Sequence, residues 1–242
     1  MRIAIPSHNR PEVLQGTLDR LKGYGFTEEP DVFLADKEQL EIYKDIDCNK
    51  IVTETKGIQS KRNFIYSYYK TGEYVVCFDD SYTGMKIKKG KKLEDFNHVK
   101  QLTKIGYQEM RKNNTCMYGI NISENPFFMK SKIQFGNYAI CAKFHGFIKQ
   151  DIPFFNSTNN TGLCEDQESS MRVTKKYGGV IRFSGITFDK PKYGKVEGGI
   201  QSYLTNTERK KLERKGNIIL SKMFPDLCSL KNTGIGLKYK RV

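Results

Sequence analysis

The sequence predicts an α/β protein with a mostly parallel sheet flanked by helices. Two observations carry this prediction. The first half of the chain alternates short apolar runs with segments whose apolar residues recur at helical spacing, an order typical of parallel, doubly wound sheets. The run Tyr74–Phe78 is wholly apolar, as expected of a strand buried on both faces at the centre of such a sheet.

In the first half, strands and helices follow one another in alternation. Pro11 stands in the first turn of the first helix, and Gly23 or Gly25 ends it, as helix-end preferences favour. Ser60 is the expected cap of the third helix, which ends at Gly72. The expected strands are Arg2–Ile5, Val32–Ala35, Lys50–Thr53 and Tyr74–Phe78, and the second helix is Lys37–Asp45.

The second half is less regular. Met85–Lys92, with the sequence MKIKKGKK, is expected to form a basic loop or an edge hairpin. Thr205 and Glu208 have the spacing of a capping box, so a basic helix is expected from there to about Phe224, ended by Pro225. Further helices are expected at Glu94–Lys112 and Asp166–Tyr177, and further strands at Cys116–Ile122, Tyr138–Phe144 and Val180–Phe183.

Length and composition indicate a folded protein with a sizeable core. The 242 residues suffice for one large domain, and the 15 Phe and 14 Tyr argue against disorder. The sequence has no internal repeat and no long linker. We therefore expect one domain over residues 1–190 and a C-terminal extension over residues 191–242, packed on the same domain.

The composition also bears on location. No apolar run approaches the ~20 residues that a membrane helix needs, and Pro6 follows the start too closely for a secretion signal. The six cysteines are widely scattered without a C-x-x-C pair, which fits free thiols in a reducing compartment better than zinc ligands. We therefore expect a cytoplasmic protein without a membrane partner.

The chain is strongly basic, with 41 Lys and Arg against 27 Asp and Glu and a net charge of +14. Residues 86–112 carry a net charge of +6 and residues 191–242 a net charge of +8, so these two stretches hold the whole excess. Such a surplus favours a polyanionic partner. The lysines that we expect to contact this partner are Lys88, Lys89, Lys91, Lys92, Lys210 and Lys211.

Candidate ligand-binding residues follow the strands. In open α/β sheets, ligands bind outside the carboxyl ends of the strands. The loop after the first strand reads PSHNR, and the segment after the third strand reads GIQSKRN; both supply amide donors and cations that suit a diphosphate. The fourth strand leads into Asp79-Asp80, and Glu165-Asp166 opens a later helix.

The two acidic pairs allow more than one interpretation. Adjacent carboxylates at the end of a buried strand are unfavourable unless a cation binds them or one is protonated, and Mg²⁺ or Mn²⁺ shared with substrate phosphates meets that need. Glu165-Asp166 is a candidate general base for a hydroxyl nucleophile. Asp79-Asp80 also fits a turn or helix cap, and Glu165-Asp166 also fits the acidic bias of a helix N-terminus.

The motifs IPSHNRP, GIQSKRNF, VVCFDDS and GLCEDQE, in this order, resemble the nucleotide-sugar loops of GT-A glycosyltransferases. The sequence is most similar to the phage-type TET-associated glycosyltransferases, which act on hydroxymethylated pyrimidines in DNA. GGIQSYLTNTERKKLERK and the following MFPDL resemble the C-terminal portion of that group. The resemblance runs from about Arg2 to Leu227. It implies a GT-A (Rossmann-like) fold with a basic C-terminal helical extension, acting in the host cytoplasm if the chain is viral.

The resemblance also implies roles for individual residues. Asp80 would bind a divalent metal, Mn²⁺ or Mg²⁺, that bridges the diphosphate, and Asp166 with Glu165 would deprotonate the acceptor hydroxyl. Related chains often carry a third Asp where this one has Ser81, so either Asp80 is the sole direct protein ligand or the metal is weakly held. The residues that would bind the nucleoside-diphosphate sugar, a UDP-sugar, are Pro6, Ser7, Asn9, Arg10, Gly57, Gln59, Arg62, Asn63 and Asp79.

The resulting hypothesis is sugar transfer to a hydroxymethylated pyrimidine in DNA, by a single displacement that inverts the anomeric carbon. Tyr82 and the pair Phe127-Phe128 are candidates to stack on such a base, unless they pack in the core or line a loop. The alternatives are the same chemistry on a glycan or protein acceptor, a nucleotidyltransferase, and a non-enzymatic nucleic-acid-binding protein. The last explains the charge but not the paired acids at the ends of strands.

Overall fold

The computed structural model describes residues 1–55, 57–152, 162–189, 205–233 and 236–242. The α-helices are α1 (Pro11–Gly23), α2 (Glu38–Ile42), α3 (Ile58–Tyr68), α4 (Val99–Lys112), α5 (Glu165–Tyr177) and α6 (Asn206–Met223), with the short 3₁₀ turns η1 (Pro126–Phe128) and η2 (Gly162–Cys164). The strands are β1 (Arg2–Pro6), β2 (Asp31–Leu34), β3 (Asn49–Val52), β4 (Tyr74–Phe78), β5 (Met85–Lys89), β6 (Lys92–Asp95), β7 (Met117–Ile120), β8 (Ile133–Gly136), β9 (Phe144–Ile148), β10 (Val180–Phe183), β11 (Ile186–Phe188), β12 (Cys228–Leu230) and β13 (Leu237–Tyr239).

The centre of the molecule is an eight-stranded sheet in the order β3-β2-β1-β4-β9-β7-β10-β8. β1, β2, β3 and β4 pair in parallel, and so do β7 and β10. β9 is antiparallel to both of its neighbours, and β8 is antiparallel to β10. The predicted α/β class with a mostly parallel sheet is confirmed, and β4 lies at its centre as its apolar sequence requires.

The strand directions decide which loops meet. β9 is antiparallel to both β4 and β7, so β7 and β10 point the same way as β1 and β4. The segments that follow β1, β4, β7 and β10 therefore lie at one edge of the sheet, together with the residues that precede β9. This carboxyl edge is where an open α/β sheet binds its ligands.

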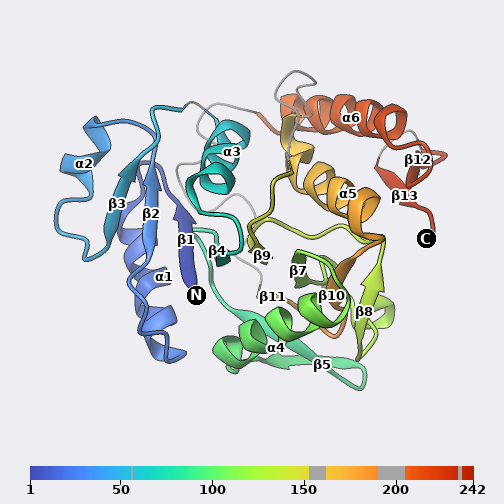
Figure 1. Cartoon of the computed structure of the whole chain (residues 1–242), viewed down its shortest axis with the longest axis horizontal. Helices are drawn as coiled ribbons and strands as arrows, with labels where there is room; N and C mark the ends of the chain where they lie inside the picture. The colour runs from blue at the N-terminus through green and yellow to red at the C-terminus, as the bar shows by residue number, and fades with distance from the viewer. Residues whose placement is uncertain (56, 153–161, 190–204, 234–235) are drawn as a thin grey trace.

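Helices cover both faces of the sheet. In Figure 1, α3 and α5 lie above the strands, and α1 and α4 lie below them. α1 turns a buried stripe of Leu14, Thr17, Leu18 and Leu21 toward the sheet, the spacing of an amphipathic helix. The main core combines these side chains with the buried residues of β1, β2, β4, β7 and β9.

The basic segment after β4 is an antiparallel hairpin. β5 pairs with β6 on one side and with β11 on the other, which makes a separate three-stranded sheet. Gly90, at a φ of 59°, stands in the turn, a left-handed conformation that glycine adopts readily. The expected hairpin is thus present, but the expected helix start at Glu94 is wrong. Residues 92–95 complete the hairpin, and α4 begins only at Val99.

Two further sequence predictions need correction. The strand expected at Tyr138–Phe144 lies instead at Phe144–Ile148, where it pairs with both β4 and β7. The observed strand reads FHGFI and is less apolar than YAICAKF, so the cross-strand partners rather than the local pattern select the strand. α3 begins at Ile58, with Gly57 as its N-cap at a φ of 84°, so Ser60 does not cap it.

The C-terminal part packs as a smaller unit. Thr205 and Glu208 form the predicted capping box at the start of α6. A second core joins α5, α6 and the β12–β13 pair through Cys164, Met171, Leu220, Phe224, Leu227, Cys228 and Leu237. The predicted division at residue 190 falls in residues 190–204, outside the described part of the chain, and stays a prediction. Among the described helices, none is long and apolar enough to cross a membrane.

Candidate active site

The loops after β1 and β4 are joined by direct contacts of Asp80. Ser7 Oγ donates to Asp80 Oδ2 over 2.8 Å, and Arg10 Nη2 donates to Asp80 Oδ1 over 2.5 Å. Thr17 Oγ1 on α1 donates to the Asp80 carbonyl oxygen over 2.6 Å. Asp80 is fully buried, so its carboxylate holds the Ser7–Arg10 loop in place beside the end of β4.

Three residues that the sequence analysis did not single out support this loop from other elements. Tyr43 OH accepts from the Arg10 amide over 2.9 Å and lies 2.7 Å from Ser7 Oγ. Gln39 in α2 exchanges two hydrogen bonds with Asn9, of 2.9 and 2.6 Å. Lys61 Nζ in α3 donates to the Ser7 carbonyl oxygen over 2.7 Å. The loop is therefore held from α2 and α3 as well as from β4.

Burial changes the charge behaviour of Lys61 and Asp80. Burial lowers the pKa of the Lys61 amine to about 8, although the carboxylates of Asp80 and Asp36 oppose this change. Burial and the adjacent Asp79 raise the pKa of Asp80 to about 7, although Arg10 and Ser7 oppose this change. The site thus holds a carboxylate that its surroundings compensate incompletely, the situation in which a bound cation is favoured.

Asp79 differs from its neighbour in exposure and partners. It is only partly buried, and its Oδ1 accepts from both the amide and the hydroxyl of Ser81, over 3.0 and 2.6 Å. Burial opposes ionisation of Asp79, but these hydrogen bonds bring its pKa below the ordinary value. Ser81 therefore supports the Asp79 carboxylate and directs its own hydroxyl there.

Arg62 connects the acidic pair at α5 to the rest of the site. Its Nη1 forms a salt bridge with Glu165 Oε1, and both side chains are largely buried. Burial would lower the pKa of Arg62, but the carboxylates of Glu165, Asp166 and Asp79 raise it. The same guanidinium thus lies within electrostatic reach of both predicted acidic pairs.

Asp166 occupies the first turn of α5. Its Oδ1 accepts from the Gln167 amide over 2.8 Å. Burial and the negative charge of Glu165 raise the pKa of Asp166, while Arg62 and the backbone amides of Gln167 and Ala142 oppose this rise. Ala142 precedes β9 at the carboxyl edge of the sheet, so the N-terminus of α5 is placed against that edge. A carboxylate with a raised pKa suits a general base near neutral pH.

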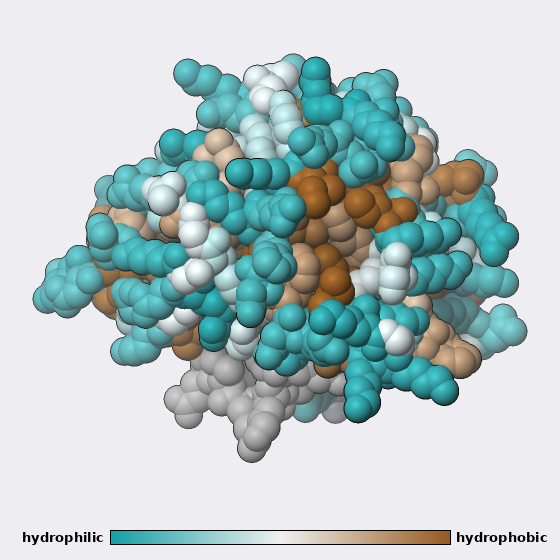
Figure 2. Space-filling model, turned by 90° about the horizontal axis from the view of Figure 1, so that it is seen from below, coloured by the Kyte–Doolittle hydropathy of each residue, from teal (hydrophilic) through white to brown (hydrophobic). Residues whose placement is uncertain are grey.

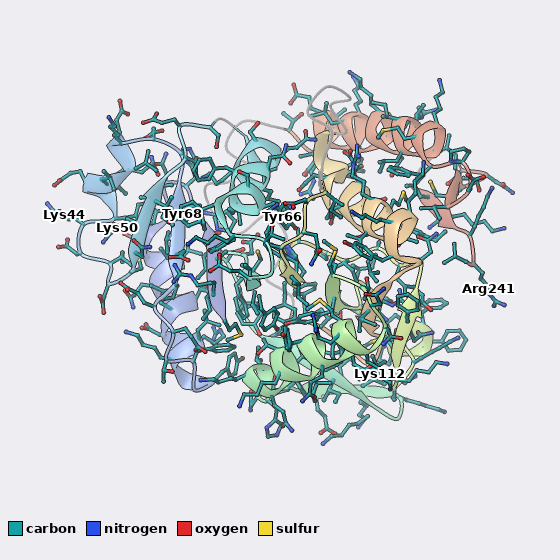
Figure 3. The ribbon with its side chains drawn as sticks, viewed as in Figure 1. Lys44, Lys50, Tyr66, Tyr68, Lys112 and Arg241 are labelled. Atoms are coloured by element: carbon teal, nitrogen blue, oxygen red, sulfur yellow. The ribbon has the colours of Figure 1, made fainter. Side chains whose placement is uncertain are left out.

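A buried hydrogen bond between Tyr66 and His145 joins α3 to the central sheet close to the site. Tyr66 follows Arg62 by one helical turn, and Figure 3 shows it near the centre of the molecule, between α3 and α5. Its hydroxyl lies 2.6 Å from His145 Nε2 in β9. Burial lowers the pKa of His145 to about 3, and the charge of Arg62 adds to this effect. The imidazole is therefore neutral at physiological pH and joins α3 to the sheet.

The remaining predicted donor-site residues lie on the same loops. Pro6 ends β1, and Asn9 is exposed with a φ of 53°, a left-handed conformation that asparagine tolerates. Gly57 precedes α3, and the first two turns of α3 carry Gln59 and Asn63. The predicted donor-site residues thus lie in the segments that follow β1 and β3, and Arg62 forms its salt bridge with Glu165. Their binding roles stay predictions.

The predicted DNA-contacting lysines fall on two separate elements. Lys89, Lys91 and Lys92 are exposed on the β5–β6 hairpin, and Lys88 is partly buried there. Lys210 and Lys211 are exposed on α6. In Figure 1, α6 lies at the top of the molecule and β5 at the bottom, so these two groups of described lysines lie on opposite sides of the molecule.

The aromatic residues expected to stack on a base differ in their exposure to solvent. Tyr82 is 4% exposed and packs edge-on against Tyr24 and Phe78, so the proposal that it stacks on a base is wrong. Phe127 and Phe128 are 84% and 68% exposed. The alternative that these two rings pack in the core is therefore excluded.

The donor set at the end of β4 fits a hard divalent cation. No group of three His, Cys, Asp or Glu residues gathers anywhere in the described part of the chain, so a resident multi-carboxylate cage is not found there. One or two carboxylates are what Mg²⁺ or Mn²⁺ uses when substrate phosphates supply further ligands. Asp79 is accessible for this role, whereas both oxygens of Asp80 already accept hydrogen bonds.

No protein-family model and no curated protein matches the sequence. Solved structures do match the fold. TarS 1–349 from S. aureus, in complex with UDP-GlcNAc, aligns with a TM-score of 0.53 and 15% identity over 91% of this chain and 67% of TarS. The mannosyltransferase PcManGT from Pyrobaculum calidifontis, in complex with GDP-Man and Mn²⁺, aligns with a TM-score of 0.53 and 11% identity over 93% of this chain and 64% of PcManGT.

A third structure is the glucosyl-3-phosphoglycerate synthase of Mycobacterium tuberculosis, in complex with Mn²⁺, UDP and glucosyl-3-phosphoglycerate. It aligns with a TM-score of 0.50 and 7% identity over 100% of this chain and 87% of the synthase. The three proteins share little sequence with this chain, so the likeness concerns the arrangement of the backbone. The chain has the fold of the GT-A nucleotide-diphospho-sugar transferases.

Proposed function

We propose that the chain is a glycosyltransferase that moves a sugar from a nucleoside-diphosphate sugar, a UDP-sugar, to the hydroxyl of a hydroxymethylated pyrimidine in DNA. The observation that carries this proposal is that the guanidinium of Arg62 pairs with Glu165 and also lies within electrostatic reach of Asp166 and Asp79, at the carboxyl edge of a GT-A sheet. Solved proteins of this fold contain UDP-GlcNAc, or GDP-Man with Mn²⁺. A sugar donor and a metal are therefore the first ligands to test.

The donor would lie along the loops after β1 and β3, with its diphosphate next to Asp79. Arg10 and Lys61 supply positive charge to this region, and the Ser7–Arg10 loop is already held by Asp80, Tyr43 and Lys61. A fixed loop loses little conformational freedom on binding. A divalent metal bound there would offset the negative charge that builds on the leaving diphosphate.

Asp166 would remove the proton of the acceptor hydroxyl as its oxygen attacks the anomeric carbon. The raised pKa of Asp166 makes its carboxylate a stronger base than an ordinary aspartate. Glu165, paired with Arg62, keeps the local negative charge that causes part of this rise. A single displacement of this kind inverts the configuration of the anomeric carbon.

The charge distribution supports DNA as the acceptor. The hairpin begins five residues after Asp80, and its exposed lysines begin at Lys89, in a chain whose net charge is +14. Figure 2 views the side on which β5 lies in Figure 1, and hydrophilic residues cover most of this face around one hydrophobic hollow. Exposed lysines bind DNA phosphates without regard to base sequence.

Mass spectrometry of the DNA tests the whole proposal. Duplex and single-stranded DNA carrying hydroxymethylcytosine or hydroxymethyluracil would be incubated with a panel of nucleotide sugars and Mn²⁺ or Mg²⁺. We expect a mass increase of one sugar, together with release of the nucleoside diphosphate. Release of pyrophosphate would indicate a nucleotidyltransferase instead, and transfer to a glycan or protein but never to DNA would refute the acceptor.

Replacement of Lys89, Lys91 and Lys92 by glutamine tests the hairpin as a DNA contact. Each lost phosphate contact should lower the slope of log Kd against log salt by about 1. Binding of the nucleotide sugar should not change, because these side chains lie on the hairpin and do not contact the Ser7–Arg10 loop. Lys88 is retained because its Nζ donates to the Met129 carbonyl oxygen over 2.7 Å.

The matched control replaces Lys210 and Lys211 on α6 by glutamine. If the hairpin holds DNA, the salt slope falls in the hairpin variant more than in this control. A reduced slope in the α6 variant alone would place the DNA on the opposite side of the molecule. Equal slopes in both variants and the wild type would mean that neither element contacts phosphate.

A further inference from the structure

The most exposed large hydrophobic side chains of the described residues are adjacent. Phe127 is 84% exposed and Phe128 is 68% exposed. Their ring centroids are 5.1 Å apart and their planes are nearly perpendicular, at 89°. Together they present aromatic surface to solvent in two directions. Exposure of this apolar surface to water is unfavourable in free energy. An exposed aromatic pair of this kind is typical of a binding site.

The backbone beneath this pair is well anchored. Asn125 Oδ1 accepts from the Phe127 amide over 3.0 Å, and the Phe128 amide donates to the Asn125 carbonyl oxygen over 3.0 Å. The next residue, Met129, is buried, and its carbonyl oxygen accepts from Lys88 Nζ. Two rings held outward by an ordered turn need no large rearrangement to receive a ligand.

The segment that carries the pair leaves the sheet at the same end as the candidate active site. It follows β7, whose carboxyl end shares an edge with that of β4. β7 is two strands away from β4 in the sheet, which is roughly 10 Å at the usual spacing of neighbouring strands. The Asn121 amide at the end of β7 donates to the Ile186 carbonyl oxygen in β11. The segment that carries the rings is thus tied to the sheet that contains the basic hairpin.

Two exposed lysines lie close to the rings in sequence. They are Lys130 and Lys132, which stand two and four residues after Phe128. The Lys132 carbonyl oxygen accepts from the Ser184 amide, and the Gly185 carbonyl oxygen accepts from the Lys88 amide. The lysines after η1 and those of β5 therefore belong to one connected region. Aromatic faces among cations match a nucleobase attached to phosphates, whereas an apolar protein partner would leave these lysines uncompensated.

We propose that Phe127 and Phe128 form a stacking platform for an unpaired base of the acceptor DNA, whose phosphates contact the neighbouring lysines. This inference rests on the proposed function and adds to it the place where the acceptor strand is held. A base inside a duplex has no free face, so the platform requires single-stranded DNA or a nucleotide turned out of the helix. It therefore also predicts a preference for single-stranded or locally unpaired acceptors.

The test replaces both rings and measures DNA binding directly. A labelled single-stranded oligonucleotide carrying hydroxymethylcytosine would be titrated with the wild type and with the double variant Phe127→Ala, Phe128→Ala. Loss of base stacking should raise Kd by about five-fold or more. The slope of log Kd against log salt should not change, because no phosphate contact is removed. The same increase should appear in the KM for DNA during transfer.

Two controls separate a ring effect from a general one. The double variant Phe127→Trp, Phe128→Trp keeps aromatic faces and should retain wild-type affinity. Ile42→Ala removes a side chain that is 45% exposed on α2, which Figure 1 shows beside the edge strand β3. This variant should have the Kd of the wild type. Equal Kd values for the wild type and the alanine double variant would overturn the proposal.

Two further results distinguish this inference from the proposed function. If the wild type transfers sugar to DNA but the alanine variant keeps its KM, the platform is refuted and the function stands. If the rings govern DNA binding but no nucleotide sugar is ever used, the platform stands and the function is refuted. A dimer that the alanine variant loses in sedimentation, with unchanged DNA affinity, would instead assign the rings to contact with a second copy of the chain.

Discussion

Replacing Asp166 by asparagine should lower the rate of sugar transfer about 100- to 10,000-fold, the usual contribution of a positioned general base. Asparagine keeps the Oδ1 atom that accepts from the Gln167 amide over 2.8 Å, so the N-terminus of α5 should stay in place. It cannot take up the proton of the acceptor hydroxyl. Binding of the nucleotide sugar, measured by calorimetry, should therefore change little while turnover is lost.

The pH dependence provides a second readout for Asp166. Only the ionised carboxylate acts as a base, so the rate should fall as the pH drops below the pKa of Asp166. Because burial and Glu165 raise that pKa, the fall should occur well above about pH 4, near which an ordinary aspartate titrates. Glu165→Gln removes a negative charge and leaves Arg62 without its partner, and both changes lower the pKa. The fall in rate should then move to more acidic pH.

A matched control is Asp226→Asn, which changes an exposed carboxylate just after α6. It should leave the rate and the pH profile unchanged. If Asp166→Asn transfers sugar at the wild-type rate, the general base is another residue. If Glu165→Gln leaves the pH profile where it was, the group that titrates in the wild type is not Asp166.

Replacing Asp79 and Asp80 separately should show which of them holds the metal. Either variant, Asp79→Asn or Asp80→Asn, should lose most Mn²⁺-dependent transfer if the two carboxylates act together on the metal. Their effects on stability should differ. Asp79 is partly exposed and its pKa lies below the ordinary value. Asp80 is fully buried, with a pKa raised to about 7.

The sign of the stability change follows from the Asp80 pKa. A raised pKa in the folded state means that the fold favours the protonated form, so this contribution to stability is present at low pH. It is lost as the pH rises through about 7, at up to about 1.4 kcal/mol per pH unit. Asp80→Asn should remove this loss and make the metal-free protein less sensitive to pH between about 4 and 7.

Thermal denaturation with and without Mn²⁺ measures these effects. Mn²⁺ should raise the midpoint of the wild type, because a ligand that binds only the folded state stabilises it, and should not raise that of the variant that has lost the metal-binding carboxylate. If Asp79→Asn alone loses the Mn²⁺ effect, Asp79 is the ligand and Asp80 serves to hold Arg10 and Ser7. Full activity of the wild type in EDTA would exclude a metal from the reaction.

Several features of the fold follow from local sequence. The apolar run Tyr74–Phe78 forms a central strand, β10 occupies the predicted Val180–Phe183, and Thr205 with Glu208 forms the predicted capping box. In each case the determining contacts lie within the segment or reflect burial on both faces. The pattern failed at Tyr138–Phe144, because the strand forms at the less apolar run Phe144–Ile148, where pairing with β4 and β7 selects it.

The candidate site shows the same limit. The sequence placed the acidic pairs and the basic loops at the ends of strands, and the sheet brings them to one edge. It did not indicate Lys61, Gln39 or Tyr43, which hold the Ser7–Arg10 loop from other elements. A lysine within a basic motif gives no signal that it will be buried, because burial depends on the element packed above it.

The sequence by itself determined the α/β class, the order of the loops that form the site, and the two stretches that carry the charge. Only the tertiary structure decided that Arg62 pairs with Glu165, 103 residues away, that Asp80 is buried behind Arg10, and that Phe127 is exposed while Tyr82 is not. Periodicity and composition record which residues avoid water within one element. The choice of partner depends on strand order and direction, which are set by contacts between segments distant in the chain.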